Sequence, residues 1–223
     1  DQYPYTATYT GITVLVPAWA RAGGTSKFKQ RLKDPDLRAK IKREIIFNIE
    51  NDRGGGDLRR VQFGLVKWNK QLEGKTLYDW ALQKGLKPTS ETGAELVIEA
   101  IQNGGASCIY HVLSDEDVER IMAHPLTMAG SDGRLTEPGN GHPHPRWYGA
   151  FPRILGHYVR EKKILKLEEA IRKMTSLSAK RLGLTDRGTI RSGAFADIVV
   201  FDPATIIDRA TFSDPHQYPV GIH

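Results

Sequence analysis

The 223-residue sequence predicts an α/β fold built on a parallel sheet. Between Ala106 and Asp132 a short apolar strand, a helix and a second apolar run follow one another, which is the order typical of parallel strands. The second run ends in a Ser-Asp-Gly turn that places the Asp132 carboxylate at the C-terminal end of a strand. Catalytic groups of α/β barrels lie at such strand ends. Asp132 is therefore a candidate catalytic residue, and capping of the next helix is the alternative.

Composition narrows the class of protein. Hydrophobic residues make up 39% and charged residues 26% of the chain, as in ordinary globular proteins. No apolar run approaches the roughly 20 residues of a membrane helix, so no membrane partner is expected. The single cysteine, Cys108, excludes an internal disulfide and fits a reducing, cytoplasmic compartment.

The net charge of +6 does not by itself predict nucleic-acid binding. Basic residues are interleaved with acidic ones, and the densest clusters fall on helix-like stretches where solvated Lys and Arg are normal. An anionic substrate is the simpler explanation.

Helices and one strand are expected in the first half of the chain. Apolar residues recur at helical spacing from Lys27 to Asn51, with an interruption and a new helix start at Asp34-Pro35. Val61 to Trp68 alternates like a strand. Thr76 caps a following helix, and Thr89 to Asn103 is a further helix that ends at a glycine pair.

The strand at Ala106–His111 opens the predicted β-α-β stretch, and Ser114 caps the helix that follows it. Cys108 lies in the middle of this strand and is expected to be a buried small hydrophobe. His111 lies at the strand's C-terminal end, where structural and functional interpretations both remain open.

The last third of the chain changes in character. Helices are expected over Phe151–Glu161 and Lys166–Arg181. After about Thr185 the composition indicates a small all-β module, with two short strands and a turn over 188–203. The chain opens without an initiator Met and stops without a closing element, so both ends are expected to be cut.

A second polar patch follows Asp132 by about ten residues. The run His142–Gly149 brings together two imidazoles, a guanidinium and two aromatic rings, stiffened by prolines. Together with the strand-end carboxylate, this loop predicts one wall of an active site. A polar surface loop is the alternative.

Several motifs, in this order along the chain, carry a family resemblance: Asp1–Thr6, Leu72–Leu77, Ser114–Val118, Gly130–Gly133, His142–Arg153, Met174–Leu177 with Arg181–Leu184, and Ala196–Asp202. In this combination the chain resembles the N-acyl-D-amino-acid deacylases, or D-aminoacylases, of the metal-dependent amidohydrolase superfamily. The last motif alone is common to many amidohydrolases.

The resemblance implies an α/β fold that is the C-terminal part of a TIM-like (β/α)8 barrel, over residues 1–184. It further implies an inserted lid subdomain at about 11–75 and part of a small β-sandwich over 185–223. The remaining partner would be the missing N-terminal half of the same protein.

The implied activity is zinc-dependent hydrolysis of the amide bond of N-acyl-D-amino acids, which yields a carboxylate and a free D-amino acid. Asp132 matches the aspartate after the last barrel strand, which is a metal ligand and takes a proton from a zinc-bound water before passing it to the leaving amine. Zinc lowers the pKa of bound water to about 7. One or two zinc ions are expected. Their other ligands, a His-x-His pair, a Cys and further His residues, would lie upstream, since His142 and His144 do not match that pair.

The resemblance also assigns residues to the substrate. Arg146 matches a loop arginine suited to a carboxylate, because its planar fork can donate two hydrogen bonds at once. Tyr3 or Tyr5 matches a tyrosine that holds the substrate α-carboxylate, and the sequence does not separate the two. His144 would line the pocket. Core packing for the tyrosines and an internal salt bridge for Arg146 are the structural alternatives.

Two other functions compete with this one. A cyclic-amide hydrolase of the dihydroorotase or hydantoinase type belongs to the same superfamily, but the His-Pro-Arg loop and the Tyr-Pro-Tyr opening argue against it. A non-catalytic fragment or interaction module is the other, and this segment alone is expected to be inactive.

Overall fold

The computed structural model describes all residues from 1 to 223, and these form two compact units. Unit 1 comprises Asp1–Thr6, Leu113–Pro138 and Pro143–His223, and unit 2 comprises Ala7–Val112 and Gly139–His142. Their limits do not coincide with the segments expected at 11–75 and 185–223. The assignment of those segments as a lid and a β-sandwich stays a prediction.

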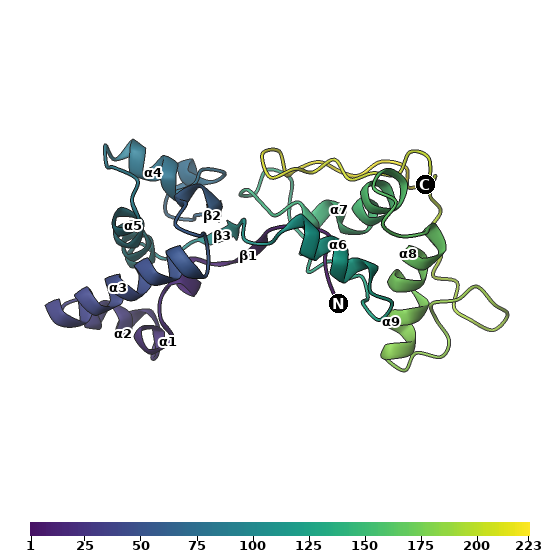
Figure 1. Ribbon diagram of the computed structural model, residues 1–223, viewed down its shortest axis with the longest axis horizontal. Helices are drawn as coiled ribbons and strands as arrows, with labels where there is room; N and C mark the ends of the chain where they lie inside the picture. The colour runs from purple at the N-terminus through teal and green to yellow at the C-terminus, as the bar shows by residue number, and fades with distance from the viewer. The chain divides into compact units, whose positions relative to one another are not determined.

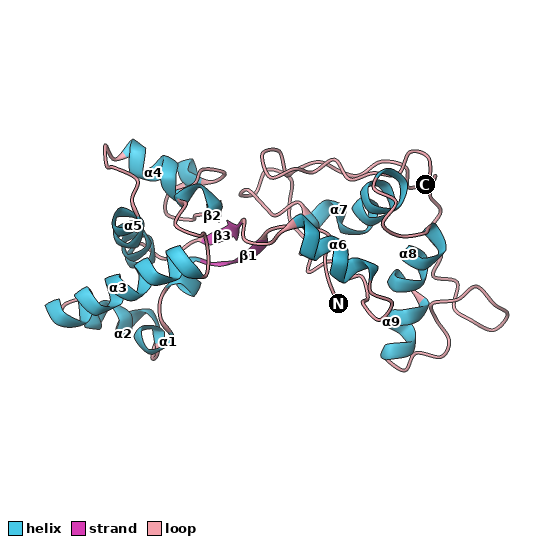
Figure 2. Cartoon of the chain, in the orientation of Figure 1, coloured by secondary structure: helices cyan, strands magenta, loops and turns pink.

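Unit 2 is mainly helical around one small sheet (Figures 1 and 2). Its elements are, in chain order, β1 (Thr8–Gly11), η1 (Ile12–Leu15), α1 (Ala18–Arg21), α2 (Gly24–Arg31), α3 (Pro35–Asn51), η2 (Leu58–Arg60), β2 (Val61–Leu65), η3 (Lys70–Leu72), α4 (Leu77–Gln83), α5 (Ser90–Gln102) and β3 (Ser107–Tyr110).

The predicted helix starts of unit 2 are confirmed by their caps. The Asp34 side chain accepts hydrogen bonds from the backbone at the start of α3, with Pro35 as the first helical residue. Thr76 and Asp79 form a reciprocal capping box on α4, and Thr89 caps α5. These are local interactions within four residues, which explains why the sequence alone reveals them.

The sheet of unit 2 has the strand order β1-β3-β2, and both pairings are antiparallel. Ile109 on β3 lies opposite Tyr9 on one side and Gln62 on the other. The predicted parallel β-α-β arrangement of β3 with the run before Asp132 is therefore wrong. An apolar strand pattern reports burial on both sides, but it does not report the direction of the neighbouring strands.

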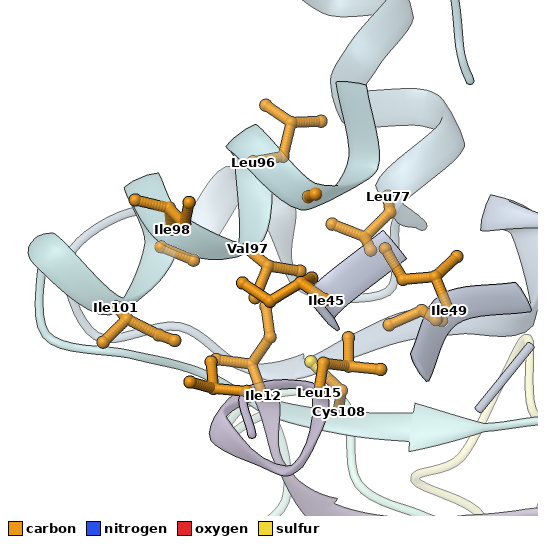
Figure 3. Close-up of a cluster of buried hydrophobic side chains, with 14 of the residues drawn as sticks. Ile12, Leu15, Ile45, Ile49, Leu77, Leu96, Val97, Ile98, Ile101 and Cys108 are labelled. Carbon is orange, nitrogen blue, oxygen red and sulfur yellow. The ribbon is translucent and has the colours of Figure 1, made fainter. Parts of the chain in front are cut away.

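The core of unit 2 is formed where α3 and α5 face the sheet and η1. Ile41, Ile45 and Ile49 recur every four residues on α3 and are fully buried. Figure 3 shows two of them with the apolar side chains of α5 and with Cys108. Cys108 is fully buried, as expected for a small hydrophobe, and burial raises the pKa of its thiol.

Unit 1 contains α6 (Asp115–Ala123), α7 (Arg146–Arg153), η4 (Ile154–Glu161), α8 (Leu167–Met174) and α9 (Ser176–Arg181). The helix type changes at η4, which is a π-helix, shortly after Pro152, a residue without an N–H to donate. Gln2 and Ala129 form a parallel bridge, in which Gln2 N donates to Met128 O at 3.0 Å and Gly130 N donates to Gln2 O at 2.9 Å.

The two strands expected within 188–203 are not formed. Only isolated antiparallel bridges occur nearby, between Phe201 and Ile222 and between Ile207 and Val220. The side chains of Ile198 and Val199 are 62% and 71% exposed. A strand requires a neighbour that satisfies its backbone, and no segment of this chain pairs with Ile198 or Val199 as a strand.

The whole is a mixed α/β chain in which the strands do not close into a barrel. None of its helices combines the length and apolar character that a membrane crossing demands.

One face of the helix formed by α7 and η4 carries an alternation of arginine and glycine. Arg146, Gly149, Arg153 and Gly156 follow at intervals of three or four residues and so lie on the same side. A Cβ at Gly156 would lie 2.4 Å from the carbonyl oxygen of Ile206, and one at Gly149 would lie 2.4 Å from Cβ of Asp208. The absence of both side chains lets the segment 206–208 lie directly against the helix.

We expect Gly156→Ala to destabilise the protein by up to about 2 kcal/mol. Alanine favours a helix by about 1 kcal/mol over glycine, but the contact with a backbone carbonyl forces an overpacking cost of about 1–3 kcal/mol. Thermal unfolding measures the difference. Gly11→Ala is the control, because Gly11 has a φ of −69° and the nearest atom to an added Cβ is 3.5 Å away. Equal stability of both variants would contradict the close approach.

Candidate functional site

Asp132 occupies the turn after the bridged segment of unit 1. Its φ of 44° lies in the left-handed region, which Asp tolerates better than most residues. Gly133 N donates to the Ser131 hydroxyl at 3.2 Å and tightens the turn. The carboxylate is 63% exposed, so it is open to solvent on one side.

Arg146 is the buried partner of this carboxylate. Its side chain is only 2% exposed, its Nη2 forms an ion pair with Asp132 Oδ2, and its Nε donates to the Asp132 carbonyl at 3.0 Å. The guanidinium carbon lies 4.6 Å from the centre of the Tyr3 ring. Nη1 is buried and has no hydrogen-bond partner. A buried cationic N–H without an acceptor is costly.

His144 holds the backbone of Arg146 in place. It is fully buried, and its Nδ1 accepts a hydrogen bond from the Arg146 backbone N–H at 3.0 Å. Because Nδ1 is the acceptor, a neutral His144 carries its proton on Nε2. The rings of Tyr3, Tyr5 and Phe212 surround it edge-on, at centroid distances of 6.0, 5.2 and 5.1 Å.

The two candidate tyrosines have different surroundings. Tyr3 is half-buried and lies on the Arg146 guanidinium. Tyr5 is 3% exposed, and its hydroxyl donates to Asp208 Oδ2 at 3.4 Å. Burial, and then the Asp208 carboxylate, raise the pKa of Tyr5, so its hydroxyl keeps its proton. The structure thus places Tyr3, and not Tyr5, next to the guanidinium.

The structure brings all five predicted residues, Tyr3, Tyr5, Asp132, His144 and Arg146, into one cluster within unit 1. Their catalytic and binding roles stay predictions. A separate, small hollow in unit 1, lined by Gln2, Met128, Ala129 and Lys173 among others, contains none of them.

Three members of the cluster were missed by the sequence analysis: Arg153, Asp208 and Phe212. Arg153 follows Arg146 by seven residues on the same helix face, and that spacing was available as a signal. Asp208 and Phe212 belong to an irregular segment, and they reach the cluster through contacts with residues more than fifty positions away. Nothing in their local sequence indicates this.

The other two predicted histidines belong to unit 2. His111 Nε2 contacts Gln62 Oε1 at 3.1 Å, and Gln62 Nε2 contacts His142 Nε2 at 3.3 Å and donates to Gly74 O at 3.0 Å. The Gly74 carbonyl fixes the orientation of the Gln62 amide, so His142 Nε2 is the acceptor and His111 Nε2 the donor. His142 belongs to unit 2 and His144 to unit 1.

Zinc was expected on Asp132, with the other ligands elsewhere. No group of three His, Cys, Asp or Glu side chains in the chain is close enough to hold a metal ion, and the Asp132 carboxylate is occupied by Arg146. The residues present therefore do not form a zinc site by themselves.

Comparison with known proteins places this site in a family. Residues 71–222 match the model of the amidohydrolase family. D-aminoacylase of Alcaligenes xylosoxydans xylosoxydans is 43% identical over 162 residues, which are 71% of this chain and 31% of that protein. N-acyl-D-aspartate deacylase of the same organism is 46% identical over 162 residues, covering 69% of this chain and 32% of that protein.

A solved structure agrees with these matches. The crystal structure of N-acyl-D-glutamate deacylase from Bordetella bronchiseptica, complexed with zinc and a phosphonate inhibitor that mimics the tetrahedral intermediate, is similar over 100% of this chain and 37% of that one. The sequences are 31% identical and the TM-score is 0.71. The chain thus spans about a third of the length of its relatives.

The chain belongs to the amidohydrolase family. Asp132 and the His-Pro-Arg loop lie inside the matched range. Within the family it belongs with the D-aminoacylases, the N-acyl-D-amino-acid deacylases, as the sequence motifs predicted.

We expect His111 to make unit 2 less stable in acid. Burial, and then the nearby Arg60, lower the pKa of His111 below its usual value of about 6.5. Below pH 6.5 the unfolded chain binds a proton that the folded chain does not, so stability present above that pH is lost as the pH falls. The slope contributed by one group is at most about 1.4 kcal/mol per pH unit.

Urea unfolding between pH 7 and pH 5 tests this expectation, with His111→Gln showing a shallower loss than the unmodified protein. His124→Gln, which removes an exposed histidine of unit 1, is the control. An unaltered slope in His111→Gln would show that the imidazole is not the titrating group.

Proposed function

We propose that this chain supplies the carboxylate-binding and proton-transfer groups of an enzyme that hydrolyses N-acyl-D-amino acids to a carboxylate and a free D-amino acid. The observation that carries the proposal is the buried Nη1 of Arg146, which lacks a partner beside Tyr3 and Asp132. Because the chain covers about a third of its relatives, the activity belongs to the whole protein.

The proximity of Arg146 and Asp132 fits the substrate. In an N-acyl amino acid, the free carboxylate and the scissile amide nitrogen are bonded to the same carbon atom. A site for it needs a cation and a proton carrier within a few ångströms of each other. Arg146 and Asp132 are in direct contact, and Asp132 keeps a solvent-exposed side that a substrate can reach.

Arg146 would bind the substrate carboxylate through Nη1, and the Tyr3 ring would cover the guanidinium and exclude water from it. His144 would act indirectly, since it holds the Arg146 backbone and lies behind the rings. This fixed arrangement sets the position of the amide relative to Asp132.

Asp132 would move the proton. When water adds to the amide carbonyl carbon, the Asp132 carboxylate takes one of its protons. It returns that proton to the amide nitrogen as the C–N bond breaks, so that a carboxylic acid and an amine are formed, and the acid then loses its proton to the amine or to water. Zinc, in one or two ions, stays part of the proposal only as an expectation in which Asp132 is this chain's single ligand, because the residues present do not form a metal site.

The finer architecture is also proposed. Residues 1–184 would contribute the last strands and helices of a (β/α)8 barrel, with an insertion over its mouth. Residues 185–223 would contribute to a β-sandwich. The similarity to the deacylase structure over the full chain supports this assignment. A cytoplasmic location stays an expectation drawn from the single, buried thiol.

Hydrolysis of matched N-acetyl-D and N-acetyl-L amino acids by the whole protein, of which this chain is a part, tests the activity with zinc supplied. Release of amine from the D-form only is the expected result. Release from a cyclic amide such as dihydroorotate, but from neither open substrate, would replace the proposal with a cyclic-amide hydrolase. No release from any of them would favour a non-catalytic role.

We expect Asp132→Asn to reduce kcat by at least about 100-fold without unfolding the protein. Asn tolerates the left-handed backbone as well as Asp does, and its side-chain oxygen can still accept from Arg146, but it cannot carry the proton. Steady-state kinetics and circular dichroism provide the two readouts. Asp197→Asn, which neutralises an exposed aspartate paired with Arg187, is the matched control. A fully active Asp132→Asn enzyme would refute the assignment.

A further inference from the structure

Two arginines on one helix face contact two tyrosines of one short segment. Arg146 and Arg153 lie seven residues apart on α7, which is two helical turns. The guanidinium carbon of Arg146 lies 4.6 Å from the Tyr3 ring centre, and that of Arg153 lies 5.0 Å from the Tyr5 ring centre. The helix therefore holds the Tyr3–Tyr5 segment at both of its ends.

Arg153 also fixes the backbone between the two rings. Its Nε donates to the carbonyl of Pro4 at 2.9 Å, and its Nη1 donates to Asp208 Oδ2 at 3.1 Å. The Pro4 ring already restricts its own φ. Together, the proline and the hydrogen bond to its carbonyl leave the segment little freedom to rotate Tyr3 away from Arg146.

Asp208 binds both Arg153 and Tyr5, and this contact distinguishes Tyr5 from Tyr3. Its side chain is 5% exposed and accepts from both Arg153 and the Tyr5 hydroxyl through one oxygen. A carboxylate can only accept, so the Tyr5 hydroxyl points its proton at Asp208 and not at a substrate. Asp208 fits here because Gly149 has no side chain: a Cβ there would lie 2.4 Å from Cβ of Asp208 and 3.0 Å from the Tyr5 hydroxyl.

We propose that the Arg153–Asp208 ion pair is the positioning element of the carboxylate site. It holds Tyr5 and Pro4 so that the ring of Tyr3, the substrate-binding tyrosine, lies on the guanidinium of Arg146. This inference rests on the proposed function, because it names which residues prepare that site. Arg153, Asp208 and Tyr5 act through Tyr3 and do not touch the substrate.

Kinetics with two substrates that differ only in the carboxylate test the proposal. Asp208→Ala should raise KM for N-acetyl-D-leucine about tenfold and change kcat less than twofold. KM for N-acetyl-D-leucinamide, which has no carboxylate, should not change. Asp208→Asn keeps one acceptor oxygen and should raise KM only about threefold. Asp197→Ala breaks an exposed Arg–Asp pair elsewhere and should change neither substrate. Equal losses on both substrates would overturn the proposal, since a purely structural defect has that result.

A measurement without turnover keeps the test decisive. Fluorotyrosine is incorporated into the full chain, and the ¹⁹F signals of Tyr3 and Tyr5 are assigned with Tyr3→Phe and Tyr5→Phe. In Asp208→Asn the signal of Tyr3 should shift, and in Asp197→Ala it should stay in place. Asp208→Asn serves here because it is the milder of the two changes and remains informative if Asp208→Ala does not fold.

The outcomes separate the two claims. If the unsubstituted protein neither hydrolyses nor binds N-acetyl-D-leucine, the proposed function fails. The ¹⁹F signal of Tyr3, measured without substrate, then decides whether Asp208 positions Tyr3. An unshifted Tyr3 signal in Asp208→Asn overturns the positioning role, even in an active enzyme.

Discussion

The cluster in unit 1 depends on one constraint, which is the burial of the Arg146 guanidinium. A cation taken out of water must be compensated by charge and by acceptors. Asp132 supplies the charge and a carbonyl, and Tyr3 supplies the electron-rich face of its ring. These partners satisfy Nε and Nη2 but leave Nη1 without an acceptor.

The helix that carries Arg146 is adapted for close packing on the same face. Gly149 and Gly156 remove side chains where the segment 206–208 approaches, and this brings an aspartate to Arg153. Arginine needs room and an acceptor, whereas the neighbouring glycines allow the backbone of another segment to come within reach. The alternation of the two residue types therefore joins the C-terminal part of unit 1 to the cluster without a regular strand.

Features that depend on residues close together in the chain could be predicted from the sequence, and contacts between distant residues could not. The Thr76 cap and the helix starts at Asp34-Pro35 and Thr89 were predicted correctly, because the caps there act within four residues. The Asp132 turn and the His-Pro-Arg loop were found as motifs. The antiparallel neighbours of β3 and the contact of Arg153 with Asp208 are long-range pairings, and a local pattern carries no information about such partners. The sequence left Tyr3 and Tyr5 unseparated, and the contact that distinguishes their surroundings, between Tyr5 and Asp208, is also long-range.

The interruption of unit 1 by unit 2 has a consequence for how the chain reaches its native state. Gln2 contacts Val118, 116 positions further on, and closing a flexible loop of about 100 residues costs about 4 kcal/mol in entropy. Pairing of β1 with β3 brings Thr8 opposite Tyr110, so a folded unit 2 already holds the two ends of that loop together. On a ribosome almost all of unit 2 emerges before α7, which allows it to fold first. A folded unit 2 would then reduce the loop-closure entropy that is lost when Tyr3 and Arg146 come together.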